Sequence, residues 1–190
     1  MRIRHLITAA GMTVALAFTA HAQTAAATSA AGTLAADLLK DITDLEGKMM
    51  GLARAIPADK YAWRPGAGVR SIGEVLQHVA ADNYLLPALL GHAADPATGI
   101  KSDDYKTVQA FEQRTIGRDE NLAQLERSFT HVKRALAGAQ QEKMADKVSL
   151  FGQPATAQYT WILTATHLHE HLGQLIAYAR SNGVVPPWSK

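Results

Sequence analysis

The sequence predicts an all-α domain that folds as a four-helix bundle. Four long segments of the 190-residue chain place apolar residues three and four positions apart, which is the spacing of an amphipathic helix. Residues that cap or stop helices stand at the ends of these segments. No segment shows the sustained alternation of apolar and polar residues that marks a half-buried strand. Four such helices in a chain of this length are typical of a bundle around one core.

Residues 1–22 are predicted to be a cleavable signal peptide. Two arginines precede an apolar run over residues 6–20, and Ala20 and Ala22 place small side chains where a signal peptidase acts. We therefore expect cleavage after Ala22 and export to the periplasm or out of the cell. The alternative is a membrane anchor, but the run is shorter than the roughly 20 apolar residues that a span needs. We expect no stable membrane anchor.

The composition of the remaining chain excludes several classes of protein. Cleavage leaves 168 residues with 17 basic and 17 acidic side chains, and no basic cluster suits a nucleic acid. The chain has no cysteine, so it has neither a disulfide nor a lipid-modified cysteine, and any transition-metal site must use nitrogen and oxygen. Residues 23–32, rich in Ala, Thr and Ser, are predicted to be a disordered leader. The folded domain is then expected over residues 33–190.

The first two helices are bounded by clear local signals. The first is predicted from Thr33 to about Ala55, just before Pro57. The second starts at a capping box, in which Ser71 and Glu74 satisfy each other's backbone N–H groups, and runs to about residue 90. Pro87 falls inside this second pattern and is expected to kink or shorten the helix.

The second half of the chain is predicted to hold two long helices and one weak one. A weak helical piece is expected near residues 105–113, and a long helix from Arg118 to Ala137, where Gly138 stops it. Residues 140–153 are predicted to be a connection with a short apolar element at 148–151. The last helix is expected to open at Pro154 and to end near residue 181.

Three of the eight histidines fall within one five-residue stretch inside the last predicted helix. His167 and His171 are four residues apart, so they lie about 40° apart on a helical wheel, and Gln174 lies about 20° on the other side of His167. This is how one helix offers two nitrogen ligands to a metal ion, although such a pair can also be structural. His169 falls on the opposite side and is expected to face solvent. Glu170 is more simply a solvated charge than a general base.

A third nitrogen is expected from the second helix. His78 stands at the flank of its apolar face, and Asp82 follows one turn later. His78 with the histidine pair would make a three-nitrogen site that leaves positions open for water or substrate, as catalytic sites do. Asp82 is either a hydrogen-bond partner of a histidine or a fourth ligand. His92 and His131 stand apart from this group, and we assign them no role.

These pieces together resemble the DinB-like family of four-helix-bundle metalloproteins, also called YfiT-like metal-dependent hydrolases. The first matching segment is Ser71-Ile-Gly-Glu-Val-Leu-Gln-His78 in the second helix. The second is the pair His167 and His171, followed by Gly173 and Gln174 in the last helix. The loop over residues 61–66 is also similar to the family's entry into the second helix. The resemblance covers about residues 34–188.

The resemblance implies a divalent metal ion, usually zinc or nickel, held by His78, His167 and His171. Characterised relatives include thiol-dependent S-transferases and a mycothiol-dependent isomerase. The predicted signal peptide departs from this pattern, since low-molecular-weight thiols are chiefly cytoplasmic cofactors. Family likeness supports a fold and its ligands better than it supports a substrate.

The sequence therefore predicts an exported metal-dependent hydrolase or transferase that acts on a small molecule. Two alternatives stay open. One is a non-catalytic bundle that binds a metal or another ligand, in which a fourth protein ligand closes the metal site. The other is a plain helical interaction module with structural histidines. Bundles of this kind often pair through an exposed helix face, so we also expect a homodimer.

Overall fold

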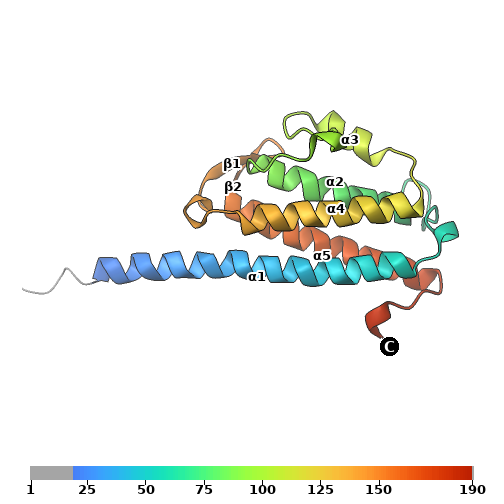
Figure 1. Cartoon of the computed structure of the whole chain (residues 1–190), viewed down its shortest axis with the longest axis horizontal. Helices are drawn as coiled ribbons and strands as arrows, with labels where there is room; N and C mark the ends of the chain where they lie inside the picture. Colours follow the sequence, from blue (N-terminus) through green and yellow to red (C-terminus); the bar gives the residue numbers. More distant parts are fainter. Residues whose placement is uncertain (1–18, 190) are drawn as a thin grey trace, which may run out of the picture.

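A computed structural model describes residues 19–189 of the chain. Four long helices form the predicted bundle, and a short helix lies outside it (Figure 1). Helices α2 and α4 pack against each other, and each of α1 and α5 contacts a neighbour on either side. The four long helices are α1 (Thr19–Ala55), α2 (Ile72–Leu89), α4 (Arg118–Ala137) and α5 (Ala157–Ser181).

Helix α1 begins earlier than the sequence analysis predicts. It starts at Thr19 rather than Thr33, and its N-terminal part extends past the other helices (Figure 1). Residues 23–32, expected as a disordered leader, lie within this helix. Five of these ten residues are alanine, the residue with the highest helix propensity, which accounts for the difference. The predicted signal peptide lies outside the described residues except for residues 19–22.

Helices α2 and α4 follow the prediction closely. The capping box at the start of α2 is present: Ser71 Oγ accepts from the Glu74 N–H, and the Glu74 carboxylate accepts from the Ser71 N–H at 2.7 Å. Helix α2 contains Pro87 and ends at Leu89, one residue before the predicted end. Helix α4 has the predicted bounds and ends at Gly138.

The connection between α4 and α5 contains a β-hairpin that the sequence analysis missed. Strand β1 (Lys147–Leu150) pairs with the antiparallel strand β2 (Gln153–Thr156), and Phe151 and Gly152 form the turn. The prediction that Pro154 opens the last helix was wrong, because this residue lies in β2 opposite Ser149. Helix α5 starts later, where the Thr156 hydroxyl accepts from the Tyr159 N–H as an N-cap.

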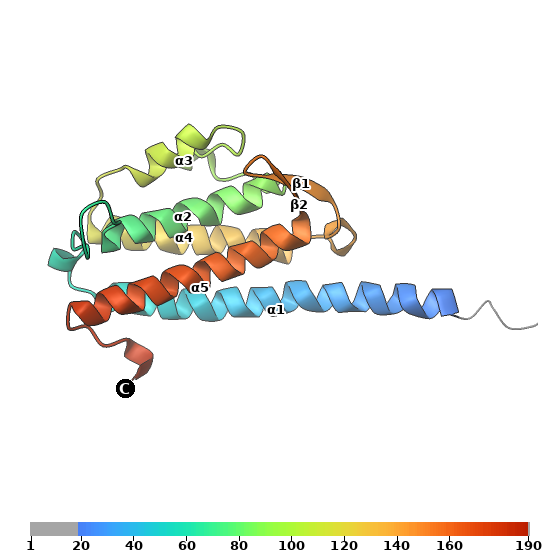
Figure 2. The same ribbon diagram turned by 180° about the vertical axis from the view of Figure 1, so that it is seen from behind.

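The weak helix predicted near residues 105–113 is confirmed as α3 (Tyr105–Glu112). It packs on the outer side of α2, away from α1 (Figures 1 and 2). The hairpin lies at the end of the bundle where α2 finishes and α5 begins, and β1 contacts both helices (Figure 2). Four single turns of 3-10 helix complete the described chain: Ala58–Lys60, Pro96–Thr98, Gln141–Lys143 and Pro187–Ser189.

The main hydrophobic core lies between the four long helices and includes Met49, Val75, Phe129, Trp161 and Leu175. A smaller core joins α2 to α3 and includes Tyr84 and Phe111. The α3 helix is therefore fixed against α2 by its own apolar contacts. This placement brings the C-terminal end of α3 beside the histidine of α2.

Candidate metal centre

The three histidines singled out from the sequence converge in the structure. His167 Nε2 lies 3.2 Å from His78 Nε2 and 2.9 Å from His171 Nε2. Helix α2 supplies His78, and α5 supplies the other two from successive turns. All three side chains are partly or fully buried. Three imidazole nitrogens from two helices thus meet at one point.

Asp82 also reaches this point. Its Oδ2 atom lies 3.1 Å from His167 Nε2 and 3.8 Å from His78 Nε2. The carboxyl group is largely buried, and burial raises its pKa to about 6. Asp82 is predicted from the sequence as a hydrogen-bond partner of a histidine or as a fourth ligand, and its position is compatible with both.

The outer nitrogens of two of the histidines are hydrogen-bonded to acceptors. His78 Nδ1 lies 2.8 Å from Glu112 Oε1 of α3, and His171 Nδ1 lies 2.8 Å from Gln174 Oε1. The Gln174 amide is oriented by a bond from its Nε2 to the Tyr178 hydroxyl, so its oxygen faces the histidine. A carboxylate oxygen and an amide oxygen can only accept a hydrogen bond, so each Nδ1 atom is the donor and carries a proton. Each Nε2 atom then presents a lone pair to the common point.

Glu112 is the member of this arrangement that the sequence analysis missed. Its second oxygen accepts from Arg70 Nη2 at 3.0 Å, which fixes the carboxylate from the side away from His78. Burial acts to raise the pKa of Glu112, but the hydrogen bonds from His78 and Arg70 outweigh it and hold the pKa below its ordinary value. The carboxylate is therefore ionised and accepts from His78 at neutral pH.

The electrostatics of the centre favour a cation. Burial, followed by the neighbouring His171 and His78, lowers the pKa of His167 to about 3, and burial also lowers the pKa of His171. Both rings are therefore neutral at pH 7, and unshared electron pairs lie close together beside a carboxylate. Nitrogen ligands about 2.0–2.1 Å from one ion, at angles of about 90–110°, are about 2.9–3.4 Å apart. The separations of His167 Nε2 from the other two Nε2 atoms, 3.2 and 2.9 Å, fall in that range, so the residues fit one small divalent ion.

His169, His92 and His131 lie apart from this centre. His169 is exposed, as predicted, and its Nε2 pairs with Asp41 at 2.9 Å. Glu170 is also exposed. His92 lies near the Trp161 ring, and His131 is buried beside Tyr84.

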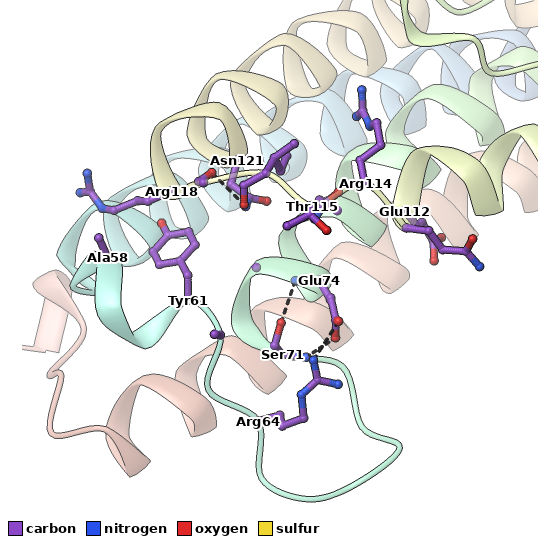
Figure 3. Close-up of a pocket in the computed structure, with 16 residues that line it drawn as sticks. Ala58, Tyr61, Arg64, Ser71, Glu74, Glu112, Arg114, Thr115, Arg118 and Asn121 are labelled. Carbon is purple, nitrogen blue, oxygen red and sulfur yellow. Dashed lines mark hydrogen bonds and ion pairs between the residues drawn. The ribbon is translucent and has the colours of Figure 1, made fainter.

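A separate cavity of about 360 Å³ lies on the other side of Glu112 (Figure 3). Figure 3 shows Tyr61, Asn121 and the capping pair of Ser71 and Glu74 around it, with Arg64 bonded to Glu74. None of the three histidines lines this cavity. Glu112 thus contacts both the cavity and the histidine centre.

The sequence matches the DinB superfamily over residues 41–175, which is most of the described chain. The chain belongs to the DinB superfamily. The matched region contains His78, His167 and His171, and it also contains Glu112. Among curated proteins, none matches this DinB chain.

Solved structures of DinB-like proteins share its fold. A DinB-like protein from Bacillus cereus is 14% identical, with a TM-score of 0.64 over 79% of this chain and 93% of that protein. A DinB-like protein from Bacillus subtilis is 17% identical, with a TM-score of 0.59 over 77% and 92%. A conserved protein from Enterococcus faecalis is 14% identical, with a TM-score of 0.62 over 75% and 93%. At these sequence identities, the similarity shows a shared fold and no more. Within residues 19–189, the DinB chain has no helix with the length and apolar character of a membrane span.

Proposed function

We propose that this DinB protein binds one divalent metal ion through the Nε2 atoms of His78, His167 and His171. The observation that carries the proposal is the convergence of three imidazoles, two of them held by acceptors on their Nδ1 atoms. Unpaired acceptors at such separations repel one another unless a cation or a shared proton lies between them. An all-nitrogen set suits zinc or nickel.

We propose further that the protein is a metal-dependent hydrolase or transferase acting on a small molecule. A divalent ion held by three histidines supplies a Lewis acid that activates a water or thiol nucleophile and polarises an electrophilic substrate. Asp82 is the group of this chain placed to handle a proton there, since its Oδ2 lies 3.1 Å from His167 Nε2. Its pKa of about 6 lets the carboxylate accept a proton near neutral pH.

A second candidate is a non-catalytic metal-binding bundle, and the same residue favours it. Asp82 Oδ2 lies close enough to two of the histidines to reach the ion that they would hold. Three histidines and one carboxylate would complete a tetrahedral, structural site. The two candidates therefore differ in whether the site keeps an open position.

An exogenous ligand separates these two candidates. The chain is loaded with Co²⁺, whose visible spectrum reports its coordination, and titrated with acetohydroxamate, which chelates a metal only where positions are open. For an enzyme with three protein ligands, we expect saturable spectral change with about one hydroxamate per ion. A Co²⁺ spectrum that acetohydroxamate leaves unchanged would assign Asp82 as a fourth ligand and support the binding protein.

Glu112 should matter for metal affinity through His78, whose Nδ1 it holds. Replacing Glu112 with alanine removes the acceptor on His78 Nδ1, so the ring loses its fixed tautomer and orientation. We expect the zinc affinity to fall by about 10–100-fold, measured by competition with a chromophoric chelator. Glu112→Gln keeps an oxygen acceptor and should recover part of the loss. Glu170→Ala is the matched control, and an equal loss in that variant would argue against a specific role for Glu112.

We place this activity outside the cytoplasm on the strength of the predicted signal peptide. Export separates the protein from the cytoplasmic thiol pool, which favours water over a thiol as the nucleophile. Hydrolysis is therefore our first choice of reaction. The homodimer stays a prediction from the likeness to other bundles.

A further inference from the structure

Two cavities near the hairpin share one residue. The first, of about 530 Å³, lies between α2, the start of α3 and the turn of the hairpin. The second, of about 770 Å³, lies between the hairpin and α5. Phe151 lines both, so its ring forms a wall between them. Both cavities have the size of a small-molecule site.

The first cavity continues a line of side chains from the histidine centre. On α2, His78 and Asp82 are followed by Leu85 and Leu89, which line the cavity. The spacing of four, three and four residues keeps all of them on one face of the helix. Leu85 and Leu89 lie about 4.5 and 10.5 Å farther along the axis than Asp82.

Helix α3 repeats this arrangement from the opposite wall. Tyr105, which lines the first cavity, is seven residues before Glu112 and so lies on the same face two turns away. Burial, and then the charges of Glu112 and Asp82, raises the pKa of the Tyr105 hydroxyl. At the other end of this face, Glu112 is bonded to His78 Nδ1 of the centre.

Helix α5 makes the third line. Leu163 and Tyr159 precede His167 by four and eight residues, and both line the second cavity. On α2, α3 and α5 alike, apolar or aromatic side chains therefore lead from a polar group of the histidine centre toward the hairpin.

Phe151 adopts an unfavourable backbone conformation, and the packing of its side chain does not offset the cost. It is the first residue of a two-residue turn, and both it (φ 52°) and Gly152 (φ 79°) are in the left-handed region. This geometry matches a type I′ turn, for which Asn-Gly is the usual sequence. A phenylalanine there costs about 1–2 kcal/mol of conformational energy. Its side chain is nevertheless 58% exposed, so burial does not repay that cost.

We propose that Phe151, with Leu85, Leu89 and Tyr105, forms a binding cleft for the apolar body of the substrate, whose reacting group lies at the histidine centre. The substrate class is a small molecule that carries an aromatic ring within about 5–10 Å of its reactive group. Phe151 and Tyr105, both about half exposed, offer ring faces for such a body. The proposal rests on the proposed function, because the centre must hold a metal for the reacting group to bind.

Two metal-binding probes that differ in one ring test this cleft. 3-Phenylpropanohydroxamate and acetohydroxamate share the chelating group, and only the first carries an aromatic ring, at about 5 Å from that group. Their dissociation constants are measured on the zinc-loaded full domain by calorimetry, for the wild type and for Phe151→Asn. We expect 3-phenylpropanohydroxamate to bind the wild type at least about tenfold more tightly than acetohydroxamate does.

In Phe151→Asn, we expect this preference to fall to about threefold or less, with acetohydroxamate affinity unchanged. Asparagine suits the left-handed position, so the melting temperature should stay the same or rise. A lost preference in a fully folded variant therefore cannot come from misfolding. Trp188→Ala removes an exposed aromatic side chain far along the sequence, on the turn Pro187–Ser189 that contacts α1, and should keep the wild-type preference.

The outcomes distinguish the proposed cleft from the proposed metal site on which it depends. Equal binding of both hydroxamates to the wild type, or an unchanged preference in Phe151→Asn, would overturn the cleft and leave the metal site standing. If zinc itself fails to bind, the proposed function is overturned first.

Discussion

Replacing His167 with alanine should abolish metal retention while leaving the helical content unchanged. His167 Nε2 lies in the middle of the centre, within 3.2 Å of both other imidazole nitrogens and of the Asp82 carboxylate. Its loss leaves His78 and His171 without the imidazole nitrogen that lies close to both of them. We expect the metal content of purified protein, measured by elemental mass spectrometry, to fall from about one ion per chain to near zero.

His169→Ala is the control for this experiment. It lies two residues away on the same helix, is exposed and pairs with Asp41. We expect its metal content to equal that of the wild type. Circular dichroism of both variants should match the wild type, since neither residue belongs to the hydrophobic core. Retention of one ion per chain by His167→Ala would refute the three-histidine site.

Replacing Asp82 with asparagine should have opposite effects on the metal-free and the metal-loaded protein. Burial raises the pKa of Asp82 from its ordinary 3.8 to about 6, so at pH 7 the folded chain holds an unfavourable buried charge. That rise corresponds to a destabilisation of up to about 3 kcal/mol. Asparagine has nearly the same shape and no charge, so the metal-free variant should be more stable by up to this amount.

The pH dependence of the free energy of unfolding provides a second test of this destabilisation. A carboxyl group whose pKa is raised on folding binds its proton more readily in the folded state, so its destabilising effect develops as the pH rises from about 4 through about 6. By about pH 4 the folded state holds the proton almost fully and the unfolded state holds much of it, so the advantage of Asp82→Asn should fall below about 1 kcal/mol. The titration of His167 occurs in both proteins and largely cancels in the comparison.

Urea unfolding of metal-free wild type and Asp82→Asn at about pH 4 and pH 7.5 measures this difference. With zinc bound the order should reverse, because the carboxylate then lies beside a cation and its removal weakens binding. A variant that is less stable than the wild type at pH 7.5 without metal would show that Asp82 is held by favourable contacts rather than desolvated.

The parts of this structure that sequence patterns predict well are those set by local chemistry. The bounds of α2 and α4 follow from the capping box at Ser71 and from Gly138, which act within one turn. The pair His167 and His171, with Gln174 one turn on, is likewise fixed by helical spacing alone. His78 and Asp82 could be singled out because they flank an apolar face on a well-defined helix.

The parts that sequence patterns miss depend on contacts between distant segments. Glu112 lies on a short helix with a weak signal, and its bond to His78 spans 34 residues without any periodic pattern. The hairpin lacks the Asn-Gly signature of its turn, since Phe151 stands at the first turn position. Pro154 suits both the first turn of a helix and an edge strand, and pairing with β1 decides between them.

The histidine centre is assembled from residues that lie 89 positions apart, in α2 and α5. An unfolded chain cannot bring them together, so the proposed metal affinity would belong to the folded bundle alone. If residues 1–22 direct an unfolded chain across a membrane, the protein acquires its ion at its destination. The metal found in the native protein would then record which ions that compartment supplies, and its identity would follow from folding location as much as from the ligands.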